Sequence, residues 1–350
     1  MSSYEAAGVS IESGELAVEL MKSSIAKATR PEVMGGIGGF AGLFDASALK
    51  KFNRPLLATS TDGVGTKTEI ARALGKYDTI GEDLVAMVVD DLVVCGAEPL
   101  FLTDYIAVGK VIPERIAEIV GGIARGCAWS RTALIGGETA EHPQLLKEDE
   151  FDLAAAATGV VEHEKLLGGH LVKVGDIAIA IESSGVHANG FSLVRHILKN
   201  AKLDLNKNVA ELGTTLGEAL LVPTTIYAPT LLDLISDTEV HAMAHITGGG
   251  LAANTARVMP KELQLTMDRS TWTLPELFKF LAAEGKVEQL DLERTFNCGV
   301  GMVLLLPPGS VDATIARLTA KGLRSWASGK VVHAQNAPGG VALEGKYGTL

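Results

Sequence analysis

Cysteine is scarce in this chain of 350 residues, and its three copies, Cys95, Cys127 and Cys298, lie far apart. They form no CxxC pair, so the sequence indicates neither a zinc site nor a disulfide framework. Cys298 has no paired base near it in the sequence, and we interpret it as a buried thiol rather than a nucleophile. This cysteine usage fits a reducing, cytoplasmic compartment.

The chain also lacks an excess of positive charge and long apolar runs. Its net charge of −11 argues against a nucleic-acid partner, because neutralising phosphates requires a basic surface. No uninterrupted apolar stretch of about 18 residues occurs, and the N-terminus has no signal-peptide pattern, so no membrane segment is predicted. Small anionic ligands stay possible, since glycine-rich backbone and a few lysines can hold phosphate.

Glycine, by contrast, is abundant, with 39 residues clustered at the joints between apolar runs. That punctuation is typical of α/β enzymes, and the length suits two domains of about 150 residues each. A polar, glycine-bearing segment at 163–176 predicts the junction, which gives α/β domains at 1–168 and 169–350. The elements that we predict are strands at 54–61, 99–109, 132–138, 152–162, 176–182, before 245–250 and near 326–333, and helices from 66, at 79–96, 113–130, 190–200, 216–236 (broken at Pro223 and Pro229) and 251–258.

The stretch STDGVGTKT, residues 60–68, contains two glycines and a lysine but is not a Walker A motif. Walker A needs four residues between its glycines and a lysine directly after the second. An aspartate at a strand end, Asp62, could meet a divalent metal. Gly63 and Gly65 would let backbone N–H groups approach phosphate, and Lys67 would add a positive charge. A tight turn with solvated Asp62 and Lys67 is the alternative.

Further carboxylates of the first half are candidates for the same site. Asp90 and Asp91 lie in the apolar helix 79–96, where adjacent residues diverge by about 100°, so one can face the core. IGGETAEHP, residues 135–143, places Glu138 after a predicted strand. Asp62, Asp90 or Asp91, and Glu138 are oxygen ligands of the kind that Mg²⁺ takes. Simple solvent exposure of these carboxylates is the alternative.

Three glycine-rich segments complete the candidates. MGGIGGFAG, residues 34–42, precedes the first clear strand, so it is no dinucleotide fingerprint and is either a connector or a flap over phosphates. SSGVHANG, residues 183–190, would place Ser184, His187 and Asn189 at a strand's carboxyl end, where open α/β sheets bind ligands. His187 is a candidate proton shuttle or phosphate partner, although a lone loop histidine is more often structural. HITGGG, residues 245–250, could seat a phosphate at a helix start.

Taken in order, these motifs resemble the phosphoribosylformylglycinamidine cyclo-ligase (AIR synthetase) family. The matching stretches run from about residue 4 to residue 302 and are YEAAGVSIESGE, RPEVMGGIGGFAGLF, TDGVGTK, DTIGEDLVAM, DLVVCGAEPLF, DYIAVGK, IGGETAE, SSGVHANGFSLVR, HITGGGL and RTFNCGVGM. The resemblance implies two α/β domains. It also implies a homodimer in which N-terminal strands of both subunits form a β-barrel, and a C-terminal sheet covered by helices.

The resemblance also implies a reaction and its residues. Formylglycinamidine ribonucleotide and ATP, with Mg²⁺, would give aminoimidazole ribonucleotide, ADP and phosphate in purine biosynthesis. The formamide oxygen is phosphorylated, and the amidine nitrogen then closes the ring. The implied nucleotide-binding residues are Gly38, Gly39, Asp62, Gly63, Gly65, Thr66, Lys67 and Asp90, and the implied metal ligands are Asp62, Asp90 and Glu138. His187, Asn189 and Lys22, the last in a mobile N-terminal segment, would be catalytic, and Ser184, Thr247, Gly248 and Gly249 would bind substrate.

The chain departs from the family pattern at three positions. Asp90 stands where the family often has Asn, Thr225 replaces a usual basic residue, and Gln144 replaces a usual glycine. Related ATP-using families fit less well: selenophosphate synthetase needs a cysteine in the N-terminal glycine-rich segment, a hydrogenase maturation relative ends in a catalytic cysteine, and thiamine-monophosphate kinase is not expected to carry TFNCGVGM. A nucleotide-binding scaffold without turnover is the alternative from another class.

Overall fold

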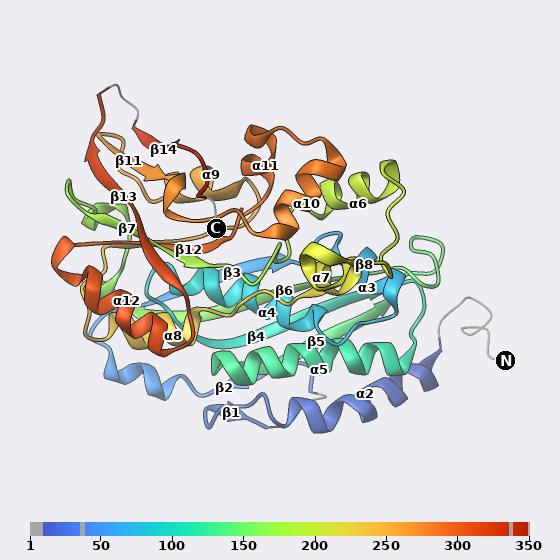
Figure 1. Cartoon of the computed structure of the whole chain (residues 1–350). Coiled ribbons are helices and arrows are strands. Elements are labelled where there is room, and N and C mark those ends of the chain that lie inside the picture. The colour runs from blue at the N-terminus through green and yellow to red at the C-terminus, as the bar shows by residue number, and fades with distance from the viewer. Residues whose placement is uncertain (1–9, 36–38, 336–338, 349–350) are drawn as a thin grey trace. The chain divides into compact units, whose positions relative to one another are not determined.

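The fold is seen in a computed structural model of the chain, which describes residues 10–35, 39–335 and 339–348 (Figure 1). The chain folds into two compact units, Met1–Leu92 with Ala97–Glu164, and Val93–Gly96 with Lys165–Leu350. The domain boundary between residues 168 and 169 stays a prediction.

The first unit contains a four-stranded sheet of order β3-β6-β4-β5, in which only β4 and β5 are parallel. A separate two-stranded ribbon pairs β1 with β2. The strands are β1 (Val33–Met34), β2 (Leu43–Phe44), β3 (Pro55–Gly63), β4 (Glu98–Val108), β5 (Ala133–Glu141) and β6 (Phe151–Glu162), and the helices are α2 (Ile11–Ile25), α3 (Lys67–Leu74), α4 (Ile80–Val93) and α5 (Pro113–Ser130).

One face of this sheet is covered by helices and the other is open. On β3, Pro55, Leu57, Thr59 and Thr61 alternate with less exposed residues, as expected of a strand with one solvated face. On the covered side α4 and α5 approach closely: a Cβ on Gly81 would lie 2.3 Å from the carbonyl oxygen of Ile119. Glycine inside these helices therefore permits packing, whereas the sequence analysis assigned glycine to the joints.

The second unit contains a six-stranded sheet of order β10-β12-β7-β13-β11-β14, antiparallel except where β14 joins β11. Its strands are β7 (Ile177–Glu182), β8 (Asn208–Val209), β9 (Thr214–Thr215), β10 (Ala242–His245), β11 (Leu263–Asp268), β12 (Val300–Leu306), β13 (Ser325–His333) and β14 (Gly340–Glu344). Its helices are α6 (Phe191–Asn200), α7 (Leu216–Leu221), α8 (Ala228–Ile235), α9 (Gly250–Ala256), α10 (Glu276–Gly285), α11 (Gln289–Thr295) and α12 (Val311–Ala320).

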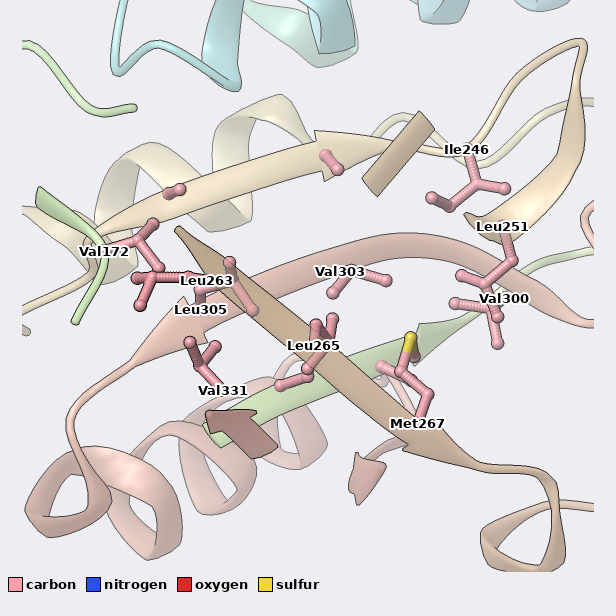
Figure 2. Packing of buried hydrophobic residues seen from close by; sticks show 14 of the residues in the cluster. Val172, Ile246, Leu251, Leu263, Leu265, Met267, Val300, Val303, Leu305 and Val331 are labelled. Carbon is pink, nitrogen blue, oxygen red and sulfur yellow. The ribbon is translucent and has the colours of Figure 1, made fainter. Parts of the chain in front are cut away.

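The core of the second unit forms on this sheet. Alternate residues of β11, namely Leu263, Leu265 and Met267, point into a cluster that also receives Val303 and Leu305 of β12 (Figure 2). β12 is buried along its whole length, which explains why its sequence is a continuous apolar run. Full burial of each such side chain stabilises the fold by about 1.5–3 kcal/mol.

The β14 segment is held by side-chain contacts as well as by its backbone pairing with β11. β14 pairs with β11, and Tyr347 just beyond it donates a hydrogen bond from Oη to Glu293 Oε1 at 3.0 Å. The Tyr347 ring also packs edge-on against Trp272, with centroids 5.4 Å apart. Residues 340–347 are therefore part of the second unit's structure.

Most predicted elements are confirmed, including the helix at 113–130 to the residue. The elements for which no range was predicted are α2, α10, α11, α12, β1, β2, β8, β9, β11, β12 and β14. The N-terminal segment that was expected to be mobile is in part a helix, because α2 buries Ala17, Met21 and Ile25 and packs on α5. Within the described ranges, no helix has the length and apolar character needed to cross a bilayer.

Candidate functional site

The chain turns sharply after β3. β3 ends at Gly63, Gly65 adopts a positive φ of 52°, and α3 begins at Lys67. Asp62 accepts a hydrogen bond from the Gly63 amide to Oδ1 at 2.7 Å. Thr66, directly before α3, is half-buried and makes no side-chain capping bond to the helix.

Lys67 lies inside the first unit rather than at its surface. Its side chain is fully buried, and its Nζ lies 2.8 Å from both oxygens of Asp83, which is buried as well. Burial lowers the pKa of the Lys67 ammonium, and the Asp83 carboxylate opposes that change. The phosphate contact of Lys67 stays a prediction, and it would require this ion pair to rearrange.

The three predicted metal ligands of the first unit do not converge in this structure. Strand pairing places Asp62 opposite Ala155 and Ala155 opposite Asp104, whereas Glu138 belongs to the neighbouring row, opposite Tyr105. Because successive residues of a strand point to opposite faces, Asp62 and Glu138 project from different faces of the sheet. Asp90 is fully buried in α4. Among the described residues, no group of three acidic, histidine or cysteine side chains is arranged to hold a metal.

Asp91, the alternative to Asp90 as a metal ligand, is better placed to act together with Asp62. Asp91 is only partly buried, and its Oδ2 lies 3.4 Å from Ser60 Oγ on β3. Ser60 and Asp62 are two residues apart on one strand, so they share the helix-covered face. Asp62 and Asp91 thus lie on the same side of the sheet.

Asp104 is a carboxylate that the sequence analysis missed. It occupies the same cross-strand row as Asp62, two strands away, and its Oδ1 would lie 1.6 Å from a Cβ at Gly137, so glycine makes room for it. Burial raises the pKa of Asp104 to about 7. The strand alternation around residue 104 placed it on the covered face, a signal that could have singled it out.

The glycine-rich segment at 34–42 connects β1 and β2, which pair in antiparallel fashion. Gly39 lies in this connection, whereas Gly38 falls outside the described residues. A Cβ on Gly42 would lie 2.4 Å from the Ile135 carbonyl oxygen, so the segment's end packs closely on β5. Lys22, on α2, is exposed and pairs with Glu19 at 2.5 Å.

In the second unit, three motifs far apart in sequence meet. A Cβ on Gly248 would lie 3.4 Å from Asn189 Oδ1, which joins SSGVHANG to ITGGG. A Cβ on Gly250 would lie 3.2 Å from the Phe296 carbonyl oxygen, which joins ITGGG to TFNCGVGM. The Asn254 amide donates to the carbonyls of Thr247, Gly248 and Gly250 and holds the glycine turn in place.

Accessibility divides the predicted residues of the second unit into two groups. Ser184, Gly248 and Gly249 are exposed, and Asn189 and Thr247 are half-buried. His187 is only 1% exposed, and its Nε2 accepts a hydrogen bond from the Ser184 amide at 3.2 Å. A neutral His187 therefore carries its proton on Nδ1.

His187 and Cys298 both lie in closely packed parts of the second unit. His187 has a positive φ of 65°, and a Cβ on Gly301 would lie 2.7 Å from its Cε1 and 2.0 Å from Tyr227 Oη. Cys298 is 2% exposed, so the prediction of a buried thiol is confirmed, and burial raises the pKa of this thiol to about 12.

Two of the three departures from the family pattern lie in irregular segments. Gln144 adopts a positive φ of 70°, a backbone conformation that a glycine would adopt without strain. Thr225 lies half-buried between α7 and α8.

Comparison with known protein families also divides the chain into an N-terminal and a C-terminal part. Models of the AIR synthase related protein N-terminal and C-terminal domains match residues 44–161 and 173–338, which places the chain in the AIR synthase related class. A phosphoribosylformylglycinamidine cyclo-ligase of Desulfitobacterium hafniense is 51% identical over 94% of this chain and 96% of its own length. One of Xanthomonas oryzae is 49% identical over 95% and 97%. The chain belongs to the phosphoribosylformylglycinamidine cyclo-ligase family.

Solved structures of two other proteins share the fold at low identity. A thiamine-monophosphate kinase from Stenotrophomonas maltophilia is 18% identical, with a TM-score of 0.66 over 95% of this chain and 96% of its own. Escherichia coli HypE, a hydrogenase maturation protein, is 17% identical, with a TM-score of 0.67 over 96% and 95%. The sequence thus matches the cyclo-ligases far more closely than these two relatives.

Proposed function

We propose that this protein catalyses the ATP-dependent ring closure of formylglycinamidine ribonucleotide to aminoimidazole ribonucleotide, with release of ADP and phosphate, in the cytoplasm. The observation that carries the proposal is the identity of about half of all residues with curated cyclo-ligases along nearly the whole chain. Among the described residues, Cys95, Cys127 and Cys298 form no disulfide, which suits a reducing compartment.

The chemistry explains why ATP is consumed. A formamide oxygen is a poor leaving group, and phosphorylation converts it into a good one, so the neighbouring amidine nitrogen can close the five-membered ring as phosphate departs. Little covalent chemistry is left for the protein, which contributes positioning and charge neutralisation.

The second unit supplies a polar surface for the substrate. Ser184, Asn189 and Thr247 present hydroxyl and amide groups, and Gly248 and Gly249 present backbone next to them. Gly249 has a positive φ of 96° and precedes α9, so backbone N–H groups near it suit an anionic group of the substrate. His187, beneath this surface, orients Ser184 through its amide.

The first unit supplies the candidates for nucleotide and metal. Carboxylate oxygens are the ligands that Mg²⁺ prefers, and Asp62 and Asp91 fit this requirement because they lie on one side of the sheet. Mg²⁺ would neutralise phosphate charge when bound, and waters and phosphate oxygens would complete its ligands. Asp90 and Glu138 fit less well, since one is buried and the other belongs to the opposite face.

Turnover tests the proposal directly. Purified protein should release phosphate from ATP only when formylglycinamidine ribonucleotide is present, and the product should carry the new aromatic amine. Phosphate release that does not depend on this substrate, or none in its presence, would refute the proposal. Asp62→Asn should abolish turnover without loss of folding, as judged by circular dichroism, because it removes charge from the metal–nucleotide turn.

The open face of the first unit's sheet supports a homodimer. Leu57 is 64% exposed and Tyr105 43% exposed on this face, and a second copy would cover both. Leu57→Arg should therefore convert a dimer to a monomer in sedimentation experiments. Trp129→Arg, at an exposed position of helix α5 rather than on the open face of the sheet, should not. A wild-type protein that sediments as a monomer at tens of micromolar would contradict the homodimer.

A further inference from the structure

Asn297, in the TFNCGVGM segment, is a buried polar residue that is not among the residues proposed to bind substrate, nucleotide or metal. It is 3% exposed and precedes β12 by a short turn. Its amide contacts the loop that follows β7, although the two segments are more than 100 positions apart. This contact links two of the three converging motifs.

The Asn297 side chain uses both ends of its carboxamide. Its Oδ1 accepts from Ser183 Oγ at 3.0 Å and from the Gly299 amide at 2.9 Å, and its Nδ2 donates to the Gly185 carbonyl at 2.8 Å. Ser183 and Gly185 flank Ser184, which is exposed. An amide is needed here because the site requires an acceptor and a donor from one short planar group.

The hydrogen bonds on either side of Ser184 leave its backbone little freedom. The Ser183 amide donates to the Gly299 carbonyl at 3.0 Å, and Ser184 Oγ donates to the Pro223 carbonyl at 2.7 Å. With Asn297, these bonds fix the direction in which the exposed Ser184 meets a ligand. Such buried, fully bonded networks restrict a loop to one conformation.

We infer that Asn297 is a positioning residue for substrate binding: it holds Ser183 and Gly185 so that Ser184, with the neighbouring Asn189, is presented to formylglycinamidine ribonucleotide. This inference rests on the proposed function. Asn297 acts through the loop and touches no reacting group itself.

The test is Asn297→Asp, which keeps the size and the acceptor oxygen but turns an oxygen toward the Gly185 carbonyl. The KM for formylglycinamidine ribonucleotide should rise about tenfold, as expected for the loss of roughly one buried charged or polar contact, with the KM for ATP changed by less than about twofold. Ser183→Ala removes one of the same bonds without adding charge and should raise the same KM by a smaller factor. The double variant should show less than the product of the two effects.

Ser328→Ala is the matched control. Ser328 is 1% exposed and donates to the Ala178 carbonyl near the opposite end of β7, so its loss weakens the same sheet away from the loop. A purely structural role of Asn297 would lower the active fraction, and thus apparent kcat, and leave both KM values unchanged. Unchanged KM values in Asn297→Asp and Ser183→Ala would overturn the inference, and Ser183→Ala alone decides if Asn297→Asp fails to fold. Absence of turnover by the wild-type protein would instead refute the proposed function.

Discussion

Replacement of Asp104 by asparagine should change how the stability of the first unit depends on pH. Burial raises the pKa of Asp104 to about 7 in the folded protein, against an ordinary value of about 3.9. Between these values the folded state keeps a proton that the unfolded state has released. The free energy of unfolding therefore falls as the pH rises from about 4 to 7, and the full penalty persists above pH 7.

The magnitude follows from the two pKa values. A separation of about three pH units corresponds to about 4 kcal/mol, which is an upper value because partial hydration of the carboxyl reduces it. Asp104→Asn cannot ionise, so its stability relative to the wild type should increase by up to this amount, about 4 kcal/mol, between pH 4 and 8. The packing of the side chain over Gly137 is preserved, since Asn has nearly the same shape.

Urea unfolding at several pH values, with hydrogen exchange of the β4 peptide to identify the first unit, measures this difference. Asp152→Asn is the control, because Asp152 is an exposed carboxylate of the same sheet and the substitution is the same. A stability difference between Asp104→Asn and the wild type that stays constant across the pH range would refute the reasoning.

Two further predictions concern the second unit. His241 is 4% exposed and lies between Asp176 and Glu239, with Nδ1 2.7 Å from Asp176 Oδ2, so His241→Ala should lower the free energy of unfolding by about 2–4 kcal/mol. Asp176→Asn should recover part of that loss in urea unfolding of the double variant, and full additivity would contradict the pairing. Gly301→Ala places a methyl group against Tyr227 Oη and should cost about 1–3 kcal/mol. Tyr227→Phe in the same chain should relieve only part of this loss, because the contact of the new Cβ with His187 Cε1 at 2.7 Å remains. A double variant that gains nothing over Gly301→Ala in thermal unfolding would count against the steric account.

Much of the local structure was predictable because it follows from short-range patterns. α5 has a proline at its start and an apolar stripe along it, and its bounds were predicted to the residue. β14 escaped prediction because it is only five residues long, and α2 because its buried face is narrow. Length alone does not decide which elements are recognised, since α10 and α12 have ten residues each and were given no predicted range.

The site was predictable only in outline. Two candidate segments of the second unit, SSGVHANG and HITGGG, lie next to each other in the structure, but nothing local in the chain showed that His187 would be buried. Register decides which carboxylates share a face, and pairing between distant strands sets register. For this reason Glu138 could not be separated from Asp62 beforehand. Asp104 was missed although strand alternation marked it, and Asn297 was missed because its partners, Ser183 and Gly185, are distant in the sequence.

The position of β14 in the second sheet bears on the order of events during protein synthesis. All strands of the first unit are present once the ribosome has passed Glu162, so that unit can fold while the rest is translated. The second sheet is complete only after Gly340–Glu344 have been synthesised, because these residues pair with the edge of β11. Until these five residues have been synthesised, that edge is open to pairing with another nascent chain, and a chaperone that shields it would increase the yield of folded protein.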